Sequence, residues 1–180
     1  MPVAPLAGSV IAAAVLLVVS GVLKVTNPGP AARSLASARG PSSATLARLI
    51  GVAEIVVGTS TLVIGGTFLT GVLALAYLGF AAFAFRLRRV DPHADCGCFG
   101  SSRSAVGTTH VAVNTVVAVA VSSTLWSPVE GVSDVVANSP ALGLPLLAMS
   151  AVLAAAIALL LSGRLGRPGA SVRGDDGRPS

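Results

Sequence analysis

Two cysteines, Cys96 and Cys98, are the only ones in the 180-residue chain, and one glycine separates them. A disulfide between them would close a very small ring, and Gly97 supplies the backbone freedom that such a ring needs. A strained bond of this kind is more readily exchanged than a structural disulfide. It also closes too little chain to stabilise a fold by loop entropy. The spacing therefore favours thiol–disulfide exchange over a structural staple.

Two other interpretations of the cysteines remain open. They could occur in a loop by chance, or His93, Cys96 and Cys98 could together bind a metal ion. Two thiolates and an imidazole suit Cu(I) or Zn(II), although no fourth ligand is evident. Redox exchange is preferred, so we expect no cofactor, with Cu or Zn as the alternative. The local charges are mixed. Basic residues favour a thiolate and acidic ones oppose it; they are Arg86, Arg88, Arg89, Arg103, Asp91 and Asp95.

The composition is that of a membrane protein. Hydrophobic residues make up 53% of the chain and charged residues only 11%, whereas soluble domains carry about 25% charged residues. The apolar runs are each near the ~20 residues that cross a bilayer; they cover residues 6–25, 46–64, 67–85, 105–126 and 141–161. The sequence therefore predicts an all-α, polytopic helical membrane bundle of about five transmembrane helices.

One transmembrane domain, residues 1–162, holds these five spans in our interpretation. No Lys or Arg precedes Lys24, so the first run lacks the basic start of a signal peptide and is expected to be a retained helix. Gly65 and Gly66 predict a tight turn between the second and third spans, and Arg86 to Arg89 are expected to end the third span. Residues 163–180 are rich in Gly, Arg, Pro, Asp and Ser and are predicted to be a disordered tail.

The basic residues predict an orientation. They flank the first and third connections and fill the tail, whereas the start of the chain, the Gly65–Gly66 turn and residues 127–140 have none. By the positive-inside rule, five spans with the N-terminus outside place every basic segment, including the C-terminus, in the cytoplasm of a multi-pass cell-membrane protein. The cysteines would then lie near the cytoplasmic face. This arrangement explains the net charge of +5 without nucleic acid as a partner.

Glu54 lies in the middle of the second span, where a bare carboxylate is costly. It shares a helix face with Gly51 and Gly58, and small residues of this kind let helices approach closely. We therefore expect Glu54 to face the bundle, either protonated or paired with Lys24, Arg48 or His110. It could carry a proton coupled to the thiol chemistry, or it could be a packing hydrogen bond.

Two further polar positions have simpler explanations. His110 and Asn114 are four residues apart and share a helix face, where they could hydrogen-bond across the bundle or transfer protons. A lone membrane histidine is more often a satisfied packing residue. Lys24, at the end of the first span, is expected to extend its ammonium group to the membrane interface.

The segment Asp95–Gly100, with the sequence DCGCFG, follows an arginine-rich helix end and precedes another apolar run. In this arrangement the chain resembles the methylamine utilisation protein MauE family, a redox-associated relative of the DoxX membrane proteins. The resemblance covers roughly residues 6–161, and the CGCFG string is its most specific part. Cys96 and Cys98 match the cysteine pair of the family.

The resemblance implies a role in maturing the methylamine dehydrogenase β-subunit, an exported, disulfide-rich protein that carries a tryptophan-derived quinone. It also implies a thioredoxin-like partner. An exported client is at odds with cysteines on the cytoplasmic side, because disulfides rarely persist in the cytosol. A scaffold that docks a thioredoxin-like protein without chemistry of its own is a further alternative, so the residues leave open whether the chain is an enzyme.

Overall fold

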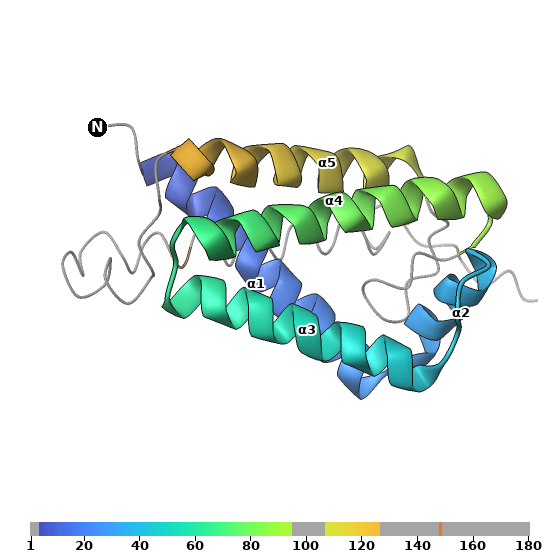
Figure 1. The fold of residues 1–180 in the computed structure, drawn as a ribbon. Coiled ribbons are helices and arrows are strands. Elements are labelled where there is room, and N and C mark those ends of the chain that lie inside the picture. Colours follow the sequence, from blue (N-terminus) through green and yellow to red (C-terminus); the bar gives the residue numbers. More distant parts are fainter. Residues whose placement is uncertain (1–3, 95–106, 127–147, 149–180) are drawn as a thin grey trace, which may run out of the picture.

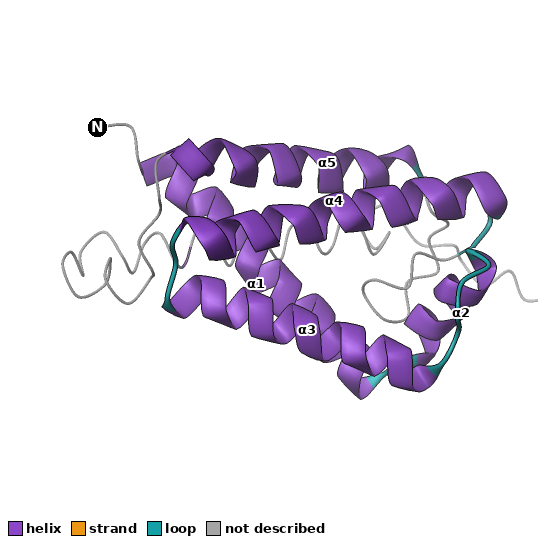
Figure 2. Cartoon of the chain, in the orientation of Figure 1, coloured by secondary structure: helices purple, strands orange, loops and turns teal. Residues whose placement is uncertain are grey.

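The computed structural model describes residues 4–94, 107–126 and 148, and within them the chain is helical apart from short connections (Figures 1 and 2). The helices are α1 (Ala4–Thr26), α2 (Gly29–Ser37), α3 (Ala44–Val63), α4 (Thr67–Val90), α5 (Thr108–Ser122) and the 3₁₀ helix η1 (Ser123–Trp126). Apart from residue 148, the expected fifth span at 141–161 lies outside the described residues. The expected tail and both cysteines lie outside them as well.

Four segments in the described part are long and apolar enough to cross a membrane: Gly8–Thr26, Ala44–Val63, Thr67–Val90 and Thr108–Trp126. Each has 19 or more residues and a mean hydropathy of at least 1.3, and about 20 helical residues match the ~30 Å hydrocarbon thickness. The prediction of an all-α helical membrane bundle is confirmed in these residues.

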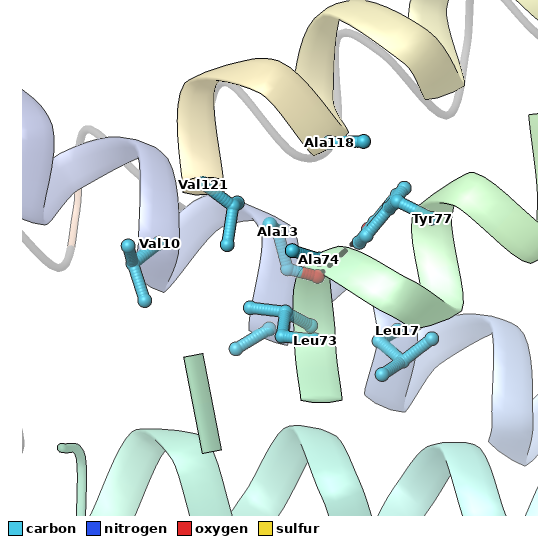
Figure 3. Close-up of a cluster of buried hydrophobic side chains, with 9 residues drawn as sticks. Val10, Ala13, Leu17, Leu73, Ala74, Tyr77, Ala118 and Val121 are labelled. Atoms are coloured by element: carbon cyan, nitrogen blue, oxygen red, sulfur yellow. Dashed lines mark hydrogen bonds between the residues drawn. The ribbon is translucent and has the colours of Figure 1, made fainter. Parts of the chain in front are cut away.

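The bundle consists of two antiparallel helix pairs. α1 packs mainly against α3, and α4 packs mainly against α5. Figure 1 shows α4 and α5 side by side, with α1 running obliquely between them and α3. The pairs meet in an apolar core of small and medium side chains from α1, α4 and α5, namely Val10, Ala13, Ala14, Leu17, Leu73, Ala74, Tyr77, Ala118 and Val121 (Figure 3). Small residues allow the helices to approach closely where lipid supplies no hydrophobic driving force.

The turn between α3 and α4 is as predicted. Gly65 and Gly66 have φ values of +67° and +89°, a region of backbone space that glycine enters without steric cost. At its other end, α3 begins at an N-cap in which the Ser43 hydroxyl oxygen accepts a hydrogen bond from the Leu46 amide at 3.0 Å. Such caps satisfy one of the open amides of the first turn.

The structure departs from the sequence prediction at the end of α4 and in an additional helix. α4 continues to Val90 rather than ending at residue 85, so Arg86, Arg88 and Arg89 belong to the helix. Cations in a last turn interact favourably with the helix dipole, so apolar character can end before the helix does. The second difference is the nine-residue α2, which was not predicted. Its buried Pro30, Ala31 and Ser34 show that packing, rather than a long apolar run, supports it.

One end of the bundle carries α2, and we call it the α2 end. α1 and α4 end there, and α3 and α5 begin there (Figure 1). A small cluster of Ala38, Ala84, Leu87 and Ala94 packs at this end, with Val111 of α5 against it. The α2 end therefore holds both described residues that border the cysteine segment, Ala94 and Gly107.

Candidate functional site

A buried ion pair joins α1 to α3. The Lys24 ammonium nitrogen lies 2.8 Å from Glu54 Oε2 and donates a second hydrogen bond to the Ser20 hydroxyl at 2.6 Å. Glu54 is 5% exposed and Lys24 is 7% exposed. Pairing removes most of the cost of placing either charge in a low-dielectric interior. The pair is therefore the main electrostatic feature of the described membrane region.

Glycines bring the two backbones close enough for this pair to form. A Cβ atom added to Gly21 of α1 would lie 2.5 Å from the Gly51 carbonyl oxygen, and one added to Gly51 would lie 2.7 Å from the Gly21 carbonyl oxygen. About two helical turns away, a Cβ at Gly58 would lie 2.8 Å from the Ala14 carbonyl oxygen. Contacts this short exclude any larger residue without movement of a helix. The predicted small-residue face with Gly51, Glu54 and Gly58 is confirmed.

Aromatic side chains of α4 complete the surroundings of the ion pair. The Lys24 nitrogen lies 5.5 Å from the Phe80 ring centroid, within the range of a cation–π interaction. Phe80 in turn packs edge-on against Tyr77, with 5.7 Å between the ring centroids. The Tyr77 hydroxyl donates a hydrogen bond to the Ala13 carbonyl at 2.8 Å, which links α4 to α1 (Figure 3).

Within the described residues, Glu54 Oε1 is buried and has no hydrogen-bond partner. The other carboxylate oxygen is held by Lys24, so the two oxygens are in different environments. A carboxylate and an ammonium joined in this way can exchange one proton without bringing net charge into the membrane. Because this transfer stays within the pair, the proton-carrier hypothesis for Glu54 stays a prediction.

The structure corrects one prediction about these residues and selects among others. Lys24 does not extend to the interface, because the close approach of α1 and α3 turns its ammonium group toward Glu54. Of the three partners considered for Glu54, Lys24 forms the ion pair, while Arg48 is exposed. Ser20, Tyr77 and Phe80 were missed. Ser20 could have been found from its position four residues before Lys24, on the same helix face.

His110 and Asn114 share the buried face of α5, as predicted. Asn114 Nδ2 donates to the His110 carbonyl at 2.7 Å, which is a bond within the same helix. Gly107 is the N-cap of α5, and its amide donates to His110 Nδ1 at 3.3 Å. The bond from Gly107 places the histidine ring at the start of α5, next to Gly107.

Cys96 and Cys98 lie outside the described residues, so their predicted redox and metal roles stay predictions. On the preceding side, the Ala94 amide donates to the Asp91 carbonyl at 3.1 Å and closes a turn after α4. The exposed His93 donates its amide to Asp91 Oδ1 at 3.2 Å. No group of three or more potential metal ligands occurs among the residues that the structure describes.

Comparison with known proteins gives one match. The sequence model of the family described as methylamine utilisation protein MauE matches residues 1–127, which include every described helix and the cysteine pair. Comparisons with curated proteins and with solved structures gave no match. The matched region covers more than half of the chain, and the membrane helices within it agree with the expected architecture. The chain therefore belongs to the MauE family of methylamine utilisation membrane proteins.

Proposed function

We propose that this protein is a membrane accessory factor that performs thiol–disulfide exchange during the maturation of an exported protein, with Cys96 and Cys98 as the exchanging pair. The observation that carries the proposal is the Cys–Gly–Cys spacing inside the region matched by the MauE family. The family's description links the chain to methylamine utilisation. The client we infer is a disulfide-rich exported protein such as the methylamine dehydrogenase β-subunit.

The exchange balances without a bound cofactor. The thiolate of one cysteine attacks the disulfide of a thioredoxin-like partner, which forms a mixed disulfide and releases one partner thiolate. The other cysteine then attacks its neighbour's sulfur in the mixed disulfide, which forms the Cys96–Cys98 bond and releases the second partner thiolate. Two electrons pass from the pair to the partner, and the partner thiolates take up the two protons. With a dithiol client the same steps run in reverse, and relative reduction potentials set the direction.

The proposal is supported by the packing of the helices that flank residues 95–106. α4 and α5 pack against each other at the α2 end, where Val111 meets the cluster around Ala84 and Leu87. The segment that carries the cysteines is therefore held at both ends by packed helices. We infer that this end is cytoplasmic, because the basic residues gather there. Glu54, with Lys24, is the proposed proton-holding group inside the bundle.

Trapping a mixed disulfide tests the proposal. In a Cys98→Ser variant, a mixed disulfide formed by Cys96 cannot be resolved, so we expect a covalent complex with a thioredoxin-like protein on non-reducing gels. Cys96→Ser gives the reciprocal experiment, and Ser102→Ala is a control substitution in the same segment that keeps both thiols. Loss of the complex on reduction would identify it as a disulfide.

Two outcomes would contradict the proposal. If the double Cys→Ser variant still supports formation of the client's disulfides, the protein is a scaffold rather than an exchange factor. If purified protein binds Cu(I) or Zn(II) tightly, loses the metal on Cys96→Ser and forms no mixed disulfide, the cysteines serve metal handling instead.

A further inference from the structure

Exposed arginines gather at the α2 end of the bundle. We call them the arginine surface, and its members are Arg33, Arg39, Arg48, Arg86, Arg88 and Arg89. In the part of the chain that the structure describes, the acidic residues are Glu54, which is buried with Lys24, and Asp91. The one ion pair found there is Lys24–Glu54. The guanidinium groups thus face outward without a protein carboxylate among the described residues.

Arg39 occupies a backbone conformation that favours glycine. It follows Ala38, the C-cap residue of α2, with a φ of +55°, and it is the only non-glycine residue with positive φ in the described chain. The chain turns there through hydrogen bonds from the Arg39 amide to the Ala36 carbonyl at 2.8 Å and from the Gly40 amide to the Leu35 carbonyl at 2.9 Å. Glycine is the usual residue at this position after a helix. An arginine that accepts this strain and leaves its side chain exposed points to a role for the charge.

Arg86 brings a guanidinium group to the backbone next to Arg39. Its Nε donates a hydrogen bond to the carbonyl of Ala38, the residue directly before Arg39, at 3.2 Å. An arginine of α4 is therefore hydrogen-bonded to the peptide group that leads into Arg39. Like charges brought together cost free energy, whereas a phosphate oxygen shared between guanidinium groups forms strong charge-assisted hydrogen bonds.

The position of the arginine surface indicates which anion it meets. Arg86, Arg88 and Arg89 lie in the last turns of a membrane helix, and Arg48 lies near the start of another. The Arg89 guanidinium carbon lies 4.5 Å from the ring centroid of Phe85, which is itself exposed on the apolar helix surface. An arginine held against a lipid-facing ring sits at the boundary between acyl chains and headgroups.

We propose that the arginine surface binds the phosphate groups of anionic phospholipids, with Arg39 and Arg86 at its centre. α2 ends directly before the Ala38–Arg39 turn to which Arg86 is hydrogen-bonded, so the short helix gains a role in lipid recognition. The inference does not depend on the chemistry of the cysteines.

Lipid retention by the purified full-length protein tests the proposal. We would reconstitute it in nanodiscs of phosphatidylcholine with added phosphatidylglycerol and count the retained lipids by native mass spectrometry. The wild-type protein should retain phosphatidylglycerol preferentially, and high salt should weaken that preference. Arg39→Gly should lower the preference about fivefold, the factor that corresponds to ~1 kcal/mol for one arginine near an anionic surface.

The variants separate binding from folding. Glycine adopts the positive φ of residue 39 without steric strain. The melting temperature of Arg39→Gly in pure phosphatidylcholine should therefore equal or exceed that of the wild-type protein. Arg39→Asn also tolerates this φ and should lower the preference as much as Arg39→Gly does, whereas Arg39→Lys keeps the charge and should retain most of the preference. Equal retention of both lipids by the wild-type protein would overturn the proposal. An unchanged phosphatidylglycerol preference in Arg39→Gly would overturn it as well.

Discussion

At the scale of single residues, Lys24 and Glu54 show how a small bundle keeps charge inside a membrane. Either charge alone would be costly in this buried site. Together they form an ion pair with 2.8 Å between Lys24 Nζ and Glu54 Oε2, and Ser20 and Phe80 lie beside the ammonium group. Removal of one partner would leave the other as an uncompensated buried charge. Substitution of one partner alone is therefore expected to cost more stability than substitution of both.

This reasoning predicts a non-additive pair of substitutions. Glu54→Gln alone should lower the free energy of unfolding by about 3–5 kcal/mol, because Lys24 remains buried without a carboxylate. Lys24→Met alone should have a comparable effect. The double variant should recover most of the loss, since no buried charge remains. Unfolding in a fixed detergent measures all three, and simply additive losses would show that the two residues do not interact.

At the scale of helices, the α1–α3 contact depends on glycines that allow the backbones to touch. A Cβ atom at Gly58 would lie 2.7 Å from Val18 Cγ2 and 2.8 Å from the Ala14 carbonyl oxygen, whereas one at Gly79 of α4 would meet nothing within 4 Å. Both glycines lie inside membrane helices, so the two alanine substitutions differ mainly in whether the added methyl group meets a neighbouring helix. The two positions form a matched pair for testing the helix packing.

Gly58→Ala should therefore destabilise the protein by about 1–3 kcal/mol, the range for overpacking a well-packed site. Gly79→Ala should leave stability unchanged or raise it slightly, because alanine is the better helix former. Thermal unfolding in one detergent compares them directly. A similar effect of both substitutions would contradict the close approach of α1 and α3.

The helices also show what could be predicted from the sequence. Apolar runs located all four described membrane spans, and the spacing of Gly51, Glu54 and Gly58 located the face that packs on α1. The nine-residue α2 could not be predicted, because it has no long apolar run and its Ala31 and Ser34 become buried only by packing against neighbouring helices. The choice of Lys24 over Arg48 as the partner of Glu54 likewise required the packing of two helices. For Cys96 and Cys98, the sequence and the family supply the whole argument.

At the scale of the whole molecule, the described helices place all of their arginines at one end of the bundle. The opposite end, with the Gly65–Gly66 turn and Trp126, has no basic residue in the described chain. Such an asymmetry sets the orientation of small membrane proteins during insertion. We infer that the α2 end faces the cytoplasm.

Labelling of a single cysteine tests this orientation. In a Cys98→Ser variant, Cys96 should react with a membrane-impermeant thiol reagent only after the cells are permeabilised. A permeant reagent on intact cells is the control for thiol reactivity. Labelling of Cys96 by the impermeant reagent in intact cells would place the cysteine segment outside and reverse the proposed orientation.

The redox state of the cysteine pair in cells tests the central proposal most directly. Rapid acid quenching followed by thiol alkylation with a mass tag separates the dithiol from the Cys96–Cys98 disulfide in the wild-type protein. We predict that both forms are present and that the disulfide fraction shifts reversibly when cells are treated with an oxidant or a reductant. A pair that stays fully reduced under every growth condition would contradict the proposed exchange chemistry.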